Sequence, residues 1–149
     1  MSRETHVFEK HPDGIFWKID NGELPAPPAA QVLGMNVVNV DVAKGTINVE
    51  FTATKSHTNP AGQIQGGFLA AMIDDTLAPC LLATLEAQQI CVTLNLNCSY
   101  IRPAMPGKIN GFGTIAARTG KTAVVNGELR QEGKLLLTAS STQIIQRIG

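Results

Sequence analysis

The chain has 149 residues, of which 44% are hydrophobic and 16% are charged. This length fits one domain, and the hydrophobic share is sufficient for a buried core. Twelve basic and twelve acidic residues give a formal net charge of zero, so no net field attracts nucleic acid or an anionic membrane surface. We therefore expect a single domain over residues 1–149, with no nucleic-acid partner and no membrane partner.

The three cysteines, Cys80, Cys91 and Cys98, lie within apolar or alternating segments. Their odd number argues against a disulfide framework, so we expect them to be small core residues. No segment has the pattern of a signal peptide or of a membrane span. No metal-ligand cluster and no phosphate-loop pattern is present. These features predict a cytoplasmic protein without a bound metal.

The N-terminal part of the chain predicts an arm followed by a hairpin. Residues 1–26 are weakly periodic, and we expect an N-terminal arm or a short helix packed on the domain. Pro27 and Pro28 fit the first turn of a short helix. Residues 35–42 and the alternating residues 47–52 flank a turn, and this pattern predicts a β-hairpin.

A helix begins at Gly66 and continues towards Leu85, with apolar residues on every face. This pattern is typical of a buried helix. Pro79 cannot donate a hydrogen bond to the carbonyl of Asp75. We therefore expect a kink or a break at the proline, with the helix over about residues 66–78 and a second short piece up to about residue 85.

Two carboxylates, Asp74 and Asp75, lie in the middle of this helix and are the only charges between Gly66 and Glu86. A carboxylate among apolar side chains is costly unless it is paired, protonated or used. The helix begins at a Gly66–Gly67 pair, where unpaired N–H groups and the positive end of the helix dipole can bind an oxygen that becomes negative. We therefore expect the functional site along this helix.

The rest of the chain is predicted to be strand. Residues 92–100 alternate with a period of two, and three further strands are expected over 108–118, 121–131 and 135–146. The polar side of the first strand is expected to face solvent or a partner; it consists of Thr93, Asn95, Asn97 and Ser99. The order of elements predicts an α+β fold, in which one antiparallel sheet wraps around one long central helix.

Several motifs in this arrangement carry a family resemblance. Asn59-Pro60-x-Gly62 precedes the helix start, Asp74 lies eight residues after Gly66, and Tyr100-x-Arg102-Pro103-Ala104 follows. Over roughly residues 27–146 the chain resembles hotdog-fold acyl-CoA thioesterases of the phenylacetate-degradation-related (PaaI-like) group, in the 4-hydroxybenzoyl-CoA thioesterase superfamily. The resemblance implies a hotdog domain that hydrolyses an acyl- or aryl-coenzyme A to the free acid and CoA. It implies no cofactor other than the coenzyme A of the substrate.

The resemblance also implies roles for individual residues. Asp74 corresponds to the catalytic carboxylate, a general base or nucleophile, and the Gly66 amide to the donor that polarises the thioester carbonyl. Asn59 corresponds to a residue that orients the carbonyl or the water, and Thr93 to a Ser or Thr near that water. Many relatives carry His immediately before the glycine pair, where this chain has Gln65. Glutamine can donate a hydrogen bond but cannot carry a proton, so Asp74 would perform the proton chemistry alone.

Three of these assignments have alternatives, and for the Gly66–Gly67 pair the alternative is a role in tight helix packing. Asp75 with Thr76 would match the Asp-Thr pair of the family if the helix were shifted by one residue. Adjacent helical residues point about 100° apart, so Asp74 and Asp75 cannot occupy one site, and counting from Gly66 favours Asp74. For Asn59 the alternative is a plain turn residue.

Substrate and partner contacts follow from the same resemblance. Arg102, Arg118 and Lys121 are candidate contacts to the coenzyme A phosphates, but a solvated surface charge is the favoured interpretation of these residues. Gly66 and Asp74 are separated by about 12 Å along the helix axis at 1.5 Å per residue. Members of the family pair their sheets edge to edge, so we expect a homodimer or a dimer of dimers with sites between subunits. Antiparallel helices would then bring Gly66 of one subunit near Asp74 of the other.

Two other functions compete with hydrolysis. A non-catalytic acyl-CoA binding protein could share the fold, but residues 1–26 are too short and too weakly basic for the DNA-binding segment of a sensor. A hotdog-fold enoyl-CoA hydratase or dehydratase would resemble sequences with an active histidine. The helix region has no histidine, which disfavours that reaction.

Overall fold

A computed structural model describes residues 8–149, so the first seven residues of the expected arm lie outside the described residues. The elements in chain order are α1 (Ile15–Asp20), α2 (Pro28–Val32), β1 (Asn36–Asp41), β2 (Thr46–Ala53), a 3-10 turn η1 (Lys55–His57), α3 (Gly66–Leu82), β3 (Gln89–Tyr100), β4 (Gly107–Arg118), β5 (Thr122–Gln131) and β6 (Lys134–Arg147).

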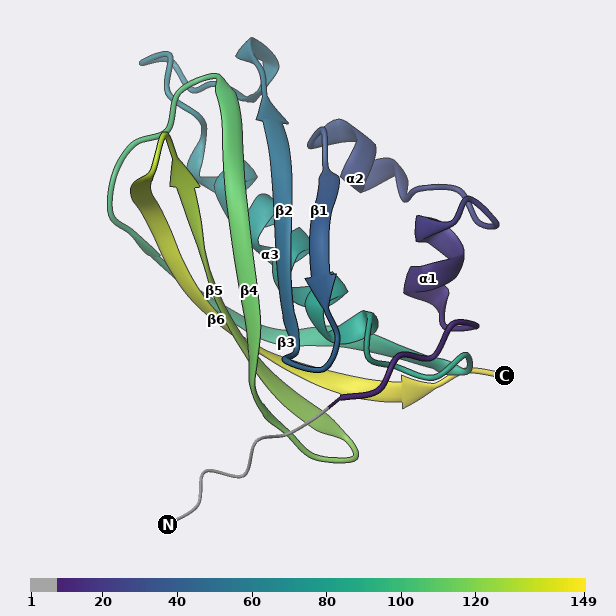
Figure 1. Ribbon diagram of the computed structural model, residues 1–149. Helices are drawn as coiled ribbons and strands as arrows, with labels where there is room; N and C mark the ends of the chain where they lie inside the picture. Colours follow the sequence, from purple (N-terminus) through teal and green to yellow (C-terminus); the bar gives the residue numbers. More distant parts are fainter. Residues whose placement is uncertain (1–7) are drawn as a thin grey trace.

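The strands form one antiparallel sheet in the order β1-β2-β4-β5-β6-β3, and this sheet curls around α3 (Figure 1). The predicted α+β hotdog architecture is confirmed. Strand β2 pairs with β4, across the intervening helix in the sequence, and β3 pairs with β6. As a result β3 lies at an edge of the sheet, where one row of its backbone groups has no neighbouring strand.

The strands after the helix are confirmed, and each end of β4, β5 and β6 lies within one residue of the predicted range. The turn between β5 and β6 contains Glu132 at φ 50° and Gly133 at φ 77°. Two consecutive residues with positive φ are characteristic of the tight turns that match the twist of a hairpin. The hairpin β1–β2 is also confirmed, with Asp41 opposite Thr46 next to its turn.

Helix α3 packs closely on β4 and β5 because glycines face it. A Cβ atom added at Gly111 would lie 2.5 Å from Thr76 Oγ1, and one added at Gly127 would lie 2.6 Å from Leu77 Cδ2. A side chain at Gly111 would therefore clash with the helix, and one at Gly127 would also clash with the carbonyl oxygen of Phe112 on β4. The helix residues that the sheet encloses completely are Met72, Ile73, Thr76, Leu77 and Leu81.

The predicted break at Pro79 is wrong, because α3 continues through the proline to Leu82. Proline removes one backbone hydrogen bond, but the helix continues with Ala83 N donating to Pro79 O at 3.0 Å. Cys80 and Leu81 on the following turn are almost completely buried. Their burial against the sheet stabilises this last turn, which the local sequence alone disfavours.

The expectation of one polar face on β3 is also wrong. The pairing register with β6 shifts between Thr93 and Asn95, which marks a β-bulge at Leu94. A bulge adds one residue to a strand and reverses which side chains face the core. Before the bulge Thr93 faces α3 while Val92 is exposed, and after it Leu96 packs on the core while Asn95 is exposed. The bulge therefore brings Thr93 into contact with the helix.

The N-terminal segment packs near the end of α3 (Figure 1). Trp17 Nε1 donates a hydrogen bond to Ala83 O at 3.0 Å, and Phe16 is buried. The ammonium group of Lys10 lies 3.9 Å from the centre of the Trp17 ring, a distance typical of a cation–π contact. For residues 8–26 the expected packing on the domain is confirmed. Within residues 8–149, no helix combines the length and the hydropathy that crossing a membrane requires.

Candidate active site

Asp74 and Thr93 form a hydrogen-bonded pair between α3 and β3. Thr93 Oγ1 donates to Asp74 Oδ1 at 3.0 Å. The second oxygen of Asp74 has no hydrogen-bond partner among residues 8–149, and the residue is only half-buried, so this oxygen can meet a water molecule or a substrate. The structure thus brings together two of the residues that the sequence analysis assigned to the site.

Asp75 has a different environment, although it is the next residue. Its Oδ2 atom is buried and has no hydrogen-bond partner among residues 8–149. Burial, and then the charge of Asp74, raise the pKa of Asp75 above its usual value of 3.8. Both effects disfavour the ionised form of this carboxyl group.

Asp75 lines a cavity of about 550 Å³. The cavity lies between α1, α2 and β1 on one side and α3 and the start of β3 on the other. Its volume is within the range of pockets that bind small organic molecules. Most of its lining is apolar and includes Ile15, Phe16, Ile19, Met35, Leu82 and Ile90.

The start of α3 presents free hydrogen-bond donors. The carbonyl of Gln65 accepts from Phe68 N at 2.9 Å, but the N–H groups of Gly66 and Gly67 have no partner in residues 8–149. No atom lies within 4 Å of a Cβ built on Gly67, so another molecule can approach its backbone. The Tyr100 hydroxyl donates to Gly66 O at 2.7 Å and links this helix end to the edge strand. The exposed Gln65 side chain makes no capping hydrogen bond.

Asn59 holds together the loop that precedes α3. Its Oδ1 atom accepts hydrogen bonds from Ala61 N at 3.0 Å and Gln63 N at 3.2 Å. The side-chain carbonyl therefore performs the turn role, which was the alternative in the sequence analysis. The Nδ2 group has no partner among the described residues, so it remains a possible donor to a ligand.

His57 is a structural residue of the same loop. It is buried, and its Nδ1 accepts a hydrogen bond from Thr54 N at 2.9 Å. Since Nδ1 accepts, Nε2 carries the proton and donates to Val32 O at 3.0 Å. Both ring nitrogens are thus occupied by backbone groups.

The cysteines are free and lie in or near the core, as expected. Burial raises the pKa of both Cys80 and Cys91 to about 12, so neither is a thiolate near neutral pH. In residues 8–149, no three His, Cys, Asp or Glu side chains are placed to hold a metal ion.

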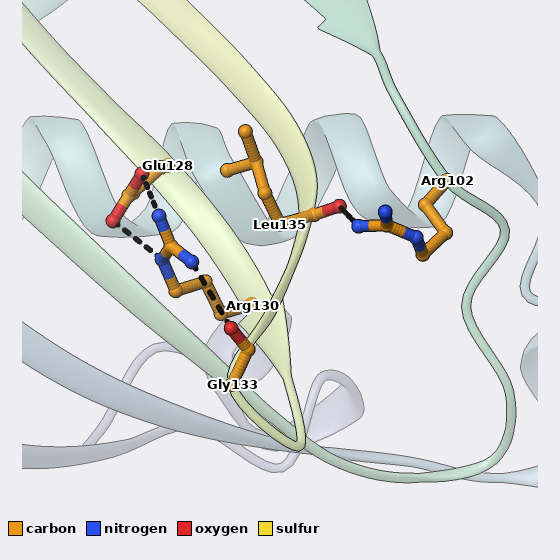
Figure 2. Close-up of polar contacts among 5 residues, drawn as sticks. All are labelled: Arg102, Glu128, Arg130, Gly133 and Leu135. Atoms are coloured by element: carbon orange, nitrogen blue, oxygen red, sulfur yellow. Dashed lines mark hydrogen bonds and ion pairs between the residues drawn. The ribbon is translucent and has the colours of Figure 1, made fainter.

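The candidate phosphate contact Arg102 follows β3. Figure 2 shows its side chain, in which Nη1 donates to Leu135 O at 2.8 Å, while the residue itself is exposed. The neighbouring Arg130 is bound more fully, because its guanidinium bonds both oxygens of Glu128 and the carbonyl of Gly133 (Figure 2). Arg102 thus keeps free donors near the end of α3 that begins at Gly66.

Arg118 and Lys121 lie elsewhere. Arg118 Nη1 donates to Thr84 Oγ1 at 2.9 Å, just beyond the C-terminal end of α3. Burial lowers the pKa of Arg118, against the raising effect of Glu86. Lys121 is exposed in the turn between β4 and β5. One protomer therefore does not gather the three predicted cations into a single cluster.

Two buried polar residues on β6 were given no role by the sequence analysis. Gln143 and Ser141 are both 0% exposed, and Gln143 lies directly opposite Thr93 across the β3–β6 pair. Gln143 Nε2 and Oε1 and Ser141 Oγ have no hydrogen-bond partner within residues 8–149. The signal in the sequence is their position in a period of two with Ala139 and Ile145, which predicts an inward face.

The family comparison agrees with this geometry. The profile of the "Thioesterase superfamily" matches residues 61–138, which is 78 of the 149 residues. The chain belongs to the thioesterase superfamily. The matched segment of this thioesterase includes Gly66, Asp74 and Thr93 but begins after Asn59.

Relatives of the thioesterase support the same conclusion. The phenylacetic acid degradation-related protein of Ralstonia eutropha JMP134 is 42% identical, with a TM-score of 0.85 over 87% of this chain and 98% of its own. Acyl-coenzyme A thioesterase 13 of Homo sapiens is 27% identical over 110 residues, 74% of this chain and 68% of its own. The PaaI protein of E. coli has a TM-score of 0.75 over 90% of this chain and 94% of its own, at 19% identity, and shares the fold. The protein is thus a PaaI-like enzyme of the hotdog fold that hydrolyses thioesters.

Proposed function

We propose that this thioesterase hydrolyses acyl- or aryl-coenzyme A esters and that Asp74 is its catalytic carboxylate. The observation that carries the proposal is the hydrogen bond from Thr93 to Asp74 Oδ1. It orients the carboxylate and leaves Oδ2 for chemistry. Acting as a base, Asp74 takes a proton from water while the water oxygen bonds to the thioester carbon. The C–S bond then breaks, and the coenzyme A sulfur receives the proton. Attack by Asp74 itself, as a nucleophile, is the variant of this step.

The N–H groups at the start of α3 are proposed to stabilise the carbonyl oxygen. Gly66 and Gly67 present free donors at the positive end of the helix dipole. Donors that are already oriented stabilise the negative charge that develops on that oxygen in the transition state. Gln65 adds a side-chain amide donor beside them, and the Asn59 Nδ2 group adds another.

The complete site is proposed to form between two subunits. Gly66 and Asp74 lie about 12 Å apart along one helix, too far for both to act on one thioester. The edge strand β3 exposes apolar side chains, with Val92 42% and Leu94 60% exposed. An exposed apolar edge is suited to pairing with a second copy. Pairing about a two-fold axis would create two identical sites, and a homodimer or a dimer of dimers would contain them.

The cavity beside Asp75 is proposed to receive the acyl group, because it is apolar and adjoins the helix that carries Asp74. Arg102 is the proposed contact to the coenzyme A phosphates at the Gly66 end, while Arg118 and Lys121 would have to act from the other end of a protomer.

No cofactor beyond coenzyme A is required. Three free cysteines support a reducing, cytoplasmic location.

A hydrolysis screen tests this function. Short, medium, long and aromatic acyl-coenzyme A esters are incubated with the purified enzyme, and free thiol is measured. We expect thiol release from at least one class and equimolar free acid. Hydration of an enoyl-coenzyme A without thiol release would instead favour the hydratase, and binding without any product would favour an acyl-CoA binding protein.

A further inference from the structure

Gln143 and Ser141 form a polar pair inside the apolar core. They occupy alternate positions of β6 and therefore face the same side of the sheet, towards α3. Their neighbours on that side of β5 are Ala123 opposite Gln143 and Val125 opposite Ser141, and both neighbours are apolar. Neither polar side chain has a hydrogen-bond partner among the described residues. Buried polar groups of native proteins are almost always bonded to protein or to ordered water.

The position of the pair connects it to the proposed site. Gln143 is directly opposite Thr93, and side chains opposite each other on antiparallel strands have Cβ atoms about 5 Å apart. Thr93 uses its single hydroxyl hydrogen to bond Asp74. Its oxygen still has lone pairs that can accept a hydrogen bond. A donor beneath Thr93 would therefore keep its hydroxyl turned towards Asp74.

We propose that Gln143 and Ser141 hold an internal water molecule beneath the Thr93–Asp74 pair, which makes Gln143 a positioning residue for the carboxylate. This rests on the proposed role of Asp74. The water accepts a hydrogen bond from Gln143 Nε2 and donates to Thr93 Oγ1 and Ser141 Oγ, while the Ser141 hydroxyl hydrogen turns towards Gln143 Oε1. Three hydrogen bonds are the usual number for a buried water.

Position 143 faces inward among apolar side chains, where an apolar residue is expected rather than glutamine. Two buried polar groups that bond each other can be replaced together by apolar groups of similar shape at little cost, or with a gain in stability. A glutamine at this position therefore suggests a demand other than stability. Sites that break a local packing rule are commonly functional.

The test compares kcat, KM and thermal midpoint for Gln143→Met, Ser141→Ala and the wild-type enzyme, with the best substrate of the screen. For Gln143→Met we expect kcat to fall about tenfold or more, as for a misplaced catalytic group, with KM little changed. The thermal midpoint should fall by a few degrees, because the Ser141 hydroxyl and the water each lose a hydrogen-bond partner. In a Thr93→Ala background, Gln143→Met should cause no further loss, because the effect passes through Thr93.

Ile145→Val is the matched control, since Ile145 is the next inward residue on β6. It should lower the thermal midpoint and leave kcat unchanged. An unchanged kcat in both Gln143→Met and Ser141→Ala would overturn the proposal. So would a kcat loss that adds in full to that of Thr93→Ala. If Gln143→Met does not fold, Ser141→Ala is judged by the same criteria.

A high-resolution crystal structure of the wild-type enzyme supplies a readout that does not depend on activity. We expect a water oxygen within hydrogen-bond distance of Gln143 Nε2 and Ser141 Oγ. A dry site would overturn the inference even in an active thioesterase. Conversely, an ordered water in a protein that hydrolyses no thioester would place the failure in the proposed function.

Discussion

The two adjacent carboxylates of α3 are both half-buried, but they differ in hydrogen bonding and in surroundings. Asp74 is half-buried, faces β3 and accepts a hydrogen bond from Thr93 at 3.0 Å. Asp75 faces a cavity lined mainly by apolar side chains, and its Oδ2 has no partner among the described residues. Because successive residues on a helix point about 100° apart, one step along the chain moves a carboxylate between these environments.

The two environments have different effects on a carboxyl group. Burial without a partner favours the protonated form of Asp75, whereas the hydrogen bond from Thr93 orients the carboxylate of Asp74. An ionised carboxylate can act as a base or nucleophile, while a neutral one can only donate or accept a hydrogen bond. We therefore propose that the chemistry belongs to Asp74 and that Asp75 is a polar group beside the proposed acyl cavity.

The largest expected effect separates the two carboxylates directly. Asp74→Asn should lower kcat by about a hundredfold or more, because a base or nucleophile is lost. Asp75→Asn should lower it far less, since Asn keeps the size and hydrogen-bonding capacity of the protonated acid. Steady-state kinetics with free-thiol detection measures both variants, and circular dichroism checks their folding. An inactive Asp75→Asn beside an active Asp74→Asn would reverse the assignment.

A smaller effect concerns stability and pH. The pKa of Asp75 is raised in the folded state, so the folded protein binds more protons than the unfolded chain between the usual value of 3.8 and the raised value. Stability of the wild type should therefore decline as pH rises through this window. Asp75→Asn removes that decline and should be more stable than the wild type at pH 7, with a smaller difference at pH 4.

Urea denaturation at both pH values measures this effect. The exposed Asp13, also replaced by Asn, serves as the matched control and should show no such pH-dependent difference. A difference between Asp75→Asn and the wild type that is equal at both pH values would contradict the raised pKa.

The smallest expected effect is on KM, and it compares Arg102, near the start of α3, with Arg118, near the end of that helix. Arg102→Gln should raise KM for coenzyme A esters by about threefold to tenfold, because one exposed phosphate contact contributes roughly a kcal/mol. Arg118→Gln should instead lower the thermal midpoint, since it removes the hydrogen bond to Thr84. Thioesters of pantetheine, which lack the nucleotide phosphates, should show no KM change with Arg102→Gln. A KM change for those esters would mean that Arg102 acts elsewhere.

Much of the fold could be predicted from hydrophobic periodicity. Strands β4, β5 and β6 alternate clearly and end at turn residues such as Gly133, so their limits were predicted closely. The bulge at Leu94 could not be predicted, because the apolar alternation continues without interruption through it. The continuation of α3 past Pro79 depends on tertiary burial, which outweighs the local cost of the proline.

The candidate site was predictable where a motif marked it. The resemblance assigned Asp74 and Thr93 before the structure placed them in contact. The cavity at Asp75 could not be predicted, because it forms only when the weakly periodic N-terminal segment folds back onto α3. Gln143 was missed because it lies in the polar run 140–143, which obscures its alternation with Ala139 and Ile145.

The central claim is that each active site combines Asp74 of one subunit with the helix start of the other. Complementation between two inactive variants tests this claim most directly. Asn59→Ala and Asp74→Ala should each be nearly inactive as homodimers. When they are unfolded together and refolded, a mixed dimer has one site with both lesions and one site with neither. Random pairing should then restore about a quarter of the wild-type activity, since half of the dimers are mixed and each has one intact site. No recovery, with mixed dimers verified by native mass spectrometry, would contradict the shared site.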